Sequence, residues 1–124
     1  MNASWVYKKA LKEMPGKIAV AVDNESLSYE ELDKKANKVT LFLKSMGIKK
    51  GDKIGFFMEN NLFITYGYMG CFKVGAVVVP TSYYTAVHEL VHEANEGEVK
   101  LYFVSKSRLE TLKSVAGDMK YLKK

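Results

Sequence analysis

The sequence has one cysteine, two histidines and no apolar run long enough to cross a bilayer. A single cysteine excludes an intrachain disulfide, and Cys71 lies within an apolar helical pattern, which favours a small buried side chain over a reactive thiol. Glu59, Asn60, Asn61 and Lys73 interrupt the most hydrophobic region, so no transmembrane segment is predicted. The N-terminus lacks an apolar core with a small-residue cleavage site, and we therefore expect a cytoplasmic protein.

Net charge is modest and dispersed. Nineteen basic and fourteen acidic residues leave a formal charge of +5 at pH 7, which permits weak attraction to anions without demanding it. The lysines are scattered along the chain, as is typical of a solvated surface, and we expect no nucleic-acid partner. A length of 124 residues suits one domain.

The stretch from Gly51 to Pro80 is the best-organised part of the chain. It predicts a short apolar strand near 54–58, a helix over about 62–74, a glycine stop at Gly75, and a second strand near 76–79 that Pro80 ends. Strand, helix and strand in so few residues indicate a βαβ unit. Both strands are continuous apolar runs, as expected of parallel strands covered on both faces.

Residues 28–47 carry strong local signals for a helix. Ser28 and Glu31 have the spacing of a capping box at its start. Gly47 supplies the left-handed residue at its end, where Ile48 can contact Leu43 as in a Schellman motif.

The remaining elements are shorter. We expect a helix over 4–14 capped by Ser4, a β-hairpin over 17–27, and a helix over 86–95 capped by Thr85. A third parallel strand near 100–104 and a helix over 108–115 complete the chain.

His88, Glu89 and His92 match H-E-x-x-H, the zinc-protease helix in which two histidines hold zinc and the glutamate activates water. The chain continues EANEGEVK, without the glycine and third histidine of the extended form, so a third ligand would have to be a carboxylate such as Glu110. Coincidence is the favoured explanation, and a small zinc hydrolase stays as an alternative.

Three motifs resemble signatures of the adenylate-forming enzymes, in the form seen in fatty-acid–CoA ligases, and they occur in the same order along the chain. They are LSYEELDKKANKVTLFLKSMGIKKGDKIGFFMENN, FKVGAVVVPTS and SYYTAVHELVHEANEGEVKLYFVS. The resemblance runs from about Lys17 to Ser105. It implies a family that uses ATP and Mg²⁺ to convert a carboxylate into an acyl-adenylate and then passes the acyl group to a thiol such as CoA.

That chemistry, as the resemblance implies it, requires a glycine-rich phosphate loop, an adenine–ribose site and a catalytic lysine that all lie C-terminal to the matching region. The segment Val104–Ser107 is too short for such a loop and lacks glycine. No catalytic, cofactor-binding or metal-ligating residue is therefore assigned, and no cofactor is expected for this chain.

The sequence as a whole predicts an α/β fold: an N-terminal helix and β-hairpin attached to a three-stranded parallel βαβαβ sheet, forming a single domain over 1–124. The function it favours is the truncated N-terminal fragment of a fatty-acid–CoA ligase-like enzyme, inactive alone. An alternative is a complementing subunit or interaction scaffold. Expected partners are a second copy, most simply in a dimer, or a separately encoded C-terminal remainder.

Overall fold

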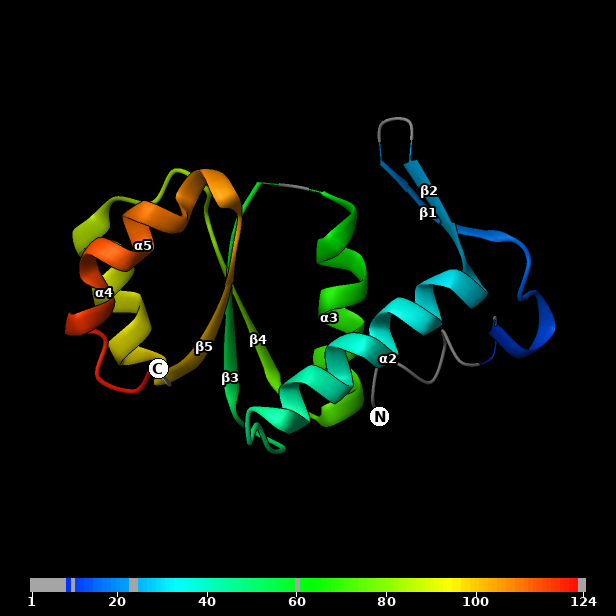
Figure 1. The fold of residues 1–124 in the computed structure, drawn as a ribbon, viewed down its shortest axis with the longest axis horizontal. Helices are drawn as coiled ribbons and strands as arrows, with labels where there is room; N and C mark the ends of the chain where they lie inside the picture. The colour runs from blue at the N-terminus through cyan, green and yellow to red at the C-terminus, as the bar shows by residue number, and fades with distance from the viewer. Residues whose placement is uncertain (1–8, 10, 23–24, 60, 123–124) are drawn as a thin grey trace. The chain divides into compact units, whose positions relative to one another are not determined.

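A computed structural model describes residues 9, 11–22, 25–59 and 61–122 (Figure 1). The chain divides into two compact units. Unit 1 comprises Met1–Lys50 and Asn60–Ala76, and unit 2 comprises Gly51–Glu59 and Val77–Lys124. The cap predicted at Ser4, and most of the helix predicted to follow it, lie outside the described residues. None of the helices in the described part of the chain has the length and hydrophobicity that a membrane crossing requires.

Unit 1 contains an antiparallel hairpin and two helices. The hairpin is formed by β1 (Ile18–Val22) and β2 (Glu25–Ser28), as predicted. Helices α2 (Tyr29–Ser45) and α3 (Leu62–Val74) follow, and they pack closely because Gly70 has no side chain. A Cβ atom on Gly70 would lie 2.5 Å from Val39 of α2. The Thr40 hydroxyl instead donates a 3.0 Å hydrogen bond to the Gly70 carbonyl, which joins the two helices.

Both ends of α2 have the predicted geometry. The Ser28 hydroxyl accepts from the Glu31 N–H at 3.1 Å, and the Glu31 carboxylate accepts from the Ser28 N–H at 3.0 Å, which completes the capping box. At the other end Gly47 has φ of 78°, and the Ile48 N–H donates to the Leu43 carbonyl at 3.0 Å. The Schellman ending is therefore confirmed.

Unit 2 is built on a three-stranded parallel sheet with the order β4-β3-β5. The strands are β3 (Lys53–Phe57), β4 (Val77–Thr81) and β5 (Val99–Val104). The prediction that Pro80 ends β4 was wrong, because Pro80 lies within the strand opposite Phe56. Proline is tolerated there because β4 is an edge strand of this sheet in the described chain, where one side of the strand makes no ladder bonds.

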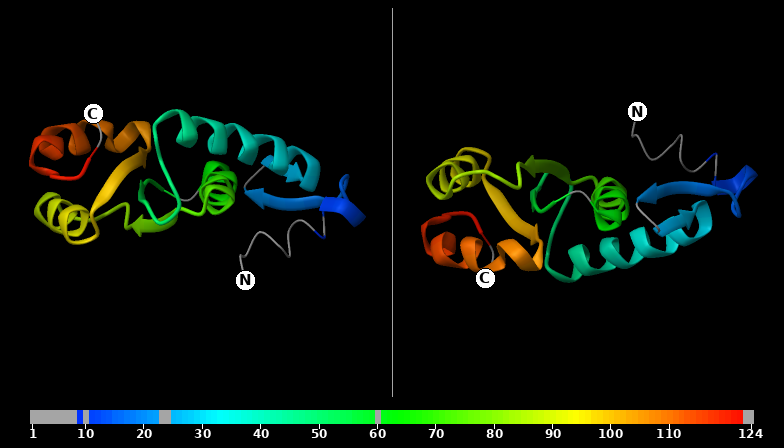
Figure 2. Two further views of the ribbon diagram at one scale, coloured as in Figure 1. Left: turned by 90° about the horizontal axis from the view of Figure 1, so that it is seen from below. Right: turned by 90° about the horizontal axis from the view of Figure 1, so that it is seen from above.

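Helices α4 (Val87–Glu96) and α5 (Leu109–Val115) lie side by side on one face of the unit 2 sheet (Figure 2). Short 3₁₀ helices flank α5 on both sides, η1 (Lys106–Arg108) and η2 (Ala116–Asp118). The prediction of Thr85 as the cap of α4 was wrong: Ala86 occupies that position without a side-chain hydrogen bond.

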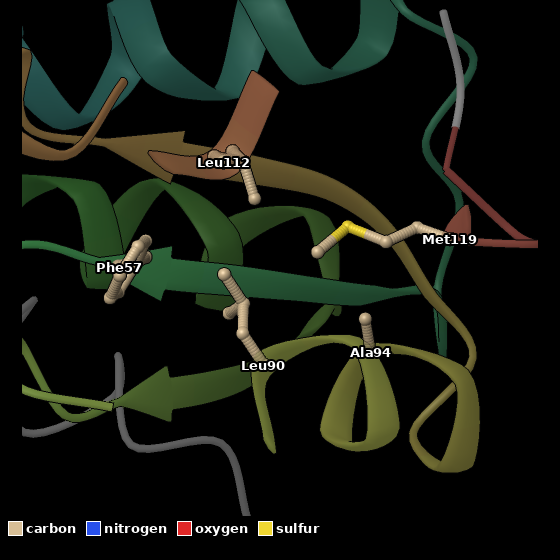
Figure 3. Close-up of a cluster of buried hydrophobic side chains, with 5 residues drawn as sticks. All are labelled: Phe57, Leu90, Ala94, Leu112 and Met119. Carbon is tan, nitrogen blue, oxygen red and sulfur yellow. The ribbon is translucent and has the colours of Figure 1, made fainter. Parts of the chain in front are cut away.

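The core of unit 2 lies between the sheet and these helices. Figure 3 shows its buried members pointing toward one another from β3, α4, α5 and the segment after η2: Phe57, Leu90, Ala94, Leu112 and Met119. Full burial of a leucine or phenylalanine side chain contributes about 1.5–3 kcal/mol. This cluster therefore supplies much of the stability of unit 2.

Tyr102 of β5 packs its ring over Gly55 of β3, where a Cβ atom would lie 2.2 Å from a ring carbon. Burial raises the pKa of the Tyr102 hydroxyl to about 12, and the neighbouring Thr81 hydroxyl opposes this increase. Neither hydroxyl makes a hydrogen bond of ordinary geometry with any other described residue. Burying Tyr102 therefore favours its neutral form.

Replacing Leu90 with alanine should lower the free energy of unfolding by about 2–5 kcal/mol, because a fully buried leucine leaves a cavity. Val87→Ala on the same helix is the matched control, since Val87 is 41% exposed and should cost well under half as much. Urea unfolding followed by circular dichroism measures both changes. Equal losses for the two variants would contradict the core described above.

Stability should fall with rising pH partly through Tyr102. In the unfolded chain the hydroxyl ionises near its ordinary pKa of 10, whereas in the folded chain it stays protonated to about 12. The contribution is therefore complete below pH 10 and is lost as the pH rises through 12. Tyr102→Phe should flatten the decline of unfolding free energy above pH 10, and Tyr84→Phe, at an 84% exposed position, should not. The same slope in both variants would refute this assignment.

Candidate functional site

The residues of the H-E-x-x-H motif lie on α4 and are exposed. His88, Glu89 and His92 all face solvent, and the His92 Nε2 atom lies 3.8 Å from the Glu96 carboxylate. Glu110, the carboxylate considered as a third ligand, is exposed and pairs with Lys113 at 3.8 Å. Within the described chain, no three histidine, cysteine or acidic side chains come close enough together to hold a metal ion. The structure therefore does not complete the set of ligands that the motif suggests.

Cys71 lies on α3 and is fully buried. Burial raises the pKa of its thiol to about 12. The reactive thiolate form is therefore strongly disfavoured at neutral pH, and the side chain acts as the small hydrophobic group that the sequence predicts.

The strand order of unit 2 creates a topological switch point between β3 and β5. The chain runs from β3 to β4, which pairs with one edge of β3, and then crosses to β5, which pairs with the other edge of β3. In open parallel sheets, ligands bind beyond the carboxyl ends of the strands at such a point. Glu59 follows β3, and Ser105–Arg108 follow β5, so these two segments border the switch point of unit 2.

A chain of hydroxyl groups joins these segments to the loop after β4. The Tyr83 hydroxyl donates to Ser107 Oγ at 3.1 Å, and Ser107 Oγ donates to Glu59 Oε2 at 3.3 Å. Ser105 Oγ lies 3.2 Å from Ser107 Oγ. The pKa of Glu59 is lowered from its ordinary value, first by its own backbone N–H and then by these serine hydroxyls and the charge of Arg108. Glu59 is therefore held in its ionised form.

Arg108 lies at the centre of this site and is held by aromatic rings. Its guanidinium carbon lies 4.4 Å from the centroid of the Tyr83 ring and 5.9 Å from that of Phe57. The backbone N–H of Arg108 donates to the Ser105 carbonyl at 2.9 Å, which fixes the turn that carries the side chain. We call Glu59, Tyr83, Ser105, Ser107 and Arg108 the carboxyl-edge cluster.

The opposite end of the unit 2 sheet has a cavity of about 210 Å³. It is lined by Gly51, Asp52, Lys53, Glu98, Lys100 and Tyr121. Asp52 and Lys100 form an ion pair across it at 2.8 Å. The cavity is thus lined by residues of both charges, and two of them, Asp52 and Lys100, already neutralise each other in an ion pair.

The sequence did not point to the carboxyl-edge cluster. In the sequence, Ser105 and Ser107 fall in a segment that is too short for a phosphate loop, and Tyr83 falls in a motif that carries the family resemblance. Arg108 stands at the start of the helix predicted over 108–115. The signal that could have found the cluster is topological: once three parallel strands are predicted, the residues that follow them must meet at one edge.

Comparisons with known proteins agree on one family. The family model described as AMP-binding enzyme matches residues 7–124. A medium/long-chain-fatty-acid–CoA/3-oxocholest-4-en-26-oate–CoA ligase of Mycobacterium marinum is 28% identical over 103 residues, which are 83% of this chain and 17% of that protein.

Solved structures show the same relationship. Coronafacic acid ligase of Pectobacterium brasiliense is 28% identical, with a TM-score of 0.92 that covers all of this chain and 25% of that protein. An anthranilate CoA ligase has a TM-score of 0.93 at 20% identity, over 98% of this chain and 24% of that one, which shows the shared fold. The chain thus spans a quarter or less of these relatives, matches their N-terminal portion, and belongs to the AMP-binding enzyme family.

Proposed function

We propose that this chain is the N-terminal part of an adenylate-forming acyl-CoA ligase and serves as a scaffold on which the rest of the adenylation domain packs. The observation that carries this proposal is the family match over residues 7–124, together with a fold that superposes on solved ligases, an anthranilate CoA ligase among them. In the proposed reaction, a carboxylate and ATP form an acyl-adenylate and pyrophosphate. The thiol of CoA then displaces AMP and takes the acyl group.

The chain alone should not perform this reaction. A triphosphate requires several backbone N–H groups that converge on one point, which glycines make possible. Segments with that composition do not occur in the sequence, and the three glycines with positive φ in the described chain, Gly47, Gly51 and Gly75, lie at a helix end or ahead of a strand. ATP, Mg²⁺ and CoA would therefore bind to residues supplied by the C-terminal remainder.

Two apolar surfaces of the chain are suited to such a partner. In unit 2, β4 is an edge strand and Val77 is 45% exposed. In unit 1, Leu41 and Phe42 of α2 are 67% and 45% exposed. An open sheet edge with apolar residues favours pairing with another chain. The proposed partner is a cytoplasmic C-terminal remainder of the ligase, and a second copy of this chain would cover the same surfaces when the remainder is absent.

ATP–pyrophosphate exchange in mixtures tests this function. The probe is coronafacic acid ligase from which the matching N-terminal quarter has been deleted, with coronafacic acid as the carboxylate. This chain should show no exchange alone, and exchange should appear when the two proteins are produced together. The deleted quarter of the relative, supplied in the same way, is the matched positive control.

Light scattering on the same samples measures assembly. We expect this chain to self-associate alone and to form a one-to-one complex with the shortened ligase. Exchange by this chain alone would contradict the scaffold function, and so would the absence of both complex and exchange when the control quarter restores them.

A further inference from the structure

We propose that the carboxyl-edge cluster binds an oxyanion, a carboxylate or phosphate group, on the guanidinium of Arg108. This proposal goes beyond the scaffold function and does not depend on it, because every residue that carries it belongs to unit 2. It assigns a ligand class to a site that the family match does not explain.

Arg108 is the only arginine in the chain, against eighteen lysines. A guanidinium offers five N–H donors in a planar fork that matches the two oxygens of a carboxylate or phosphate, whereas a lysine offers a single strongly hydrated charge. A lysine at position 108 would keep this surface as soluble as an arginine does. A single arginine at the switch point of the sheet therefore indicates a need for planar recognition.

The side chain of Arg108 is prepared for a ligand before one binds. The guanidinium carbon lies over the Tyr83 ring, 4.4 Å from its centroid, and this cation–π contact restrains the end of the side chain. The face of a guanidinium stacks on a ring while its N–H groups point outward in that plane. The entropy of ordering a long side chain is thus spent during folding, which favours binding.

One donor of this group has no acceptor in the described part of the protein. The Nε atom of Arg108 is buried there without a hydrogen-bond partner. A buried donor left unsatisfied costs about 1–3 kcal/mol. Because Nε itself is covered and the rest of Arg108 is only partly buried, an oxyanion would reach the fork at its terminal nitrogens in a bidentate contact, which is a strong type of hydrogen bond.

The charges near Arg108 determine whether a substitution should strengthen or weaken the binding of an oxyanion. Lys106 is exposed on the same 3₁₀ helix and adds positive charge. Glu59 opposes binding because its carboxylate is ionised and electrostatically coupled to Arg108. Hydrogen bonds from the hydroxyls of Ser105 and Ser107 stabilise the ionised carboxylate of Glu59. Removing the charge of Glu59 should therefore strengthen the binding of an oxyanion.

Nuclear magnetic resonance can follow Arg108 directly, because a single arginine gives a single side-chain Nε–Hε signal. The probes are inorganic phosphate and acetate, each titrated into the full chain at an ionic strength held constant with sodium chloride. We expect a saturable shift of this signal with at least one probe. Saturation by phosphate alone identifies a phosphate site, and saturation by acetate identifies a carboxylate site.

Three variants separate oxyanion binding at Arg108 from general effects of charge. Binding to each variant is followed by the backbone amide signals of the residues after β5, because Arg108→Lys removes the only arginine side-chain signal. Arg108→Lys keeps the charge and should weaken binding at least tenfold, about 1.4 kcal/mol. Glu59→Gln should tighten it several-fold, and Lys113→Gln, an exposed position on α5, should leave it unchanged. Glu59 is exposed, so its variant should fold even if Arg108→Lys does not. A shift that never saturates, or a Glu59→Gln variant that binds no tighter, would overturn the proposal.

Discussion

The pairing of β3 on both sides is the constraint on which the rest of unit 2 depends. Its residues from Ile54 to Phe57 are buried, and it forms parallel ladders with β4 and β5. A parallel strand cannot be joined to its neighbour by a tight turn, so each connection is long, and in this chain each contains a helix. The carboxyl ends of all three strands consequently meet at one edge, which is where Glu59, Tyr83 and Arg108 come together.

Local signals in the sequence were sufficient for most of the elements. The capping box at Ser28 and the glycine ending at Gly47 depend on residues three to five positions apart, so the sequence contains all the necessary information. The prediction that Pro80 ends β4 failed for the opposite reason. Whether a proline ends a strand depends on its place at a sheet edge, and that place is set by distant residues.

The carboxyl-edge cluster was harder to predict because it joins residues far apart in the chain. Tyr83 and Ser107 are 24 positions apart, and Ser107 and Glu59 are 48 positions apart. No motif spans such distances. The motif that did attract attention, at His88 and His92, is local but lies on an exposed helix face without a third ligand among the described residues. Family resemblance, in contrast, was readable directly from the sequence, and the comparisons confirm it.

Hydrogen exchange of the backbone amides tests most directly whether β3 organises a scaffold that folds within this chain. We expect the slowest exchange at Lys53–Phe57, where the strand is paired on both sides, and faster exchange along the edge strand Val77–Thr81. Rapid exchange throughout Lys53–Phe57 would contradict this expectation, since the sheet would then not persist without the remainder of a ligase.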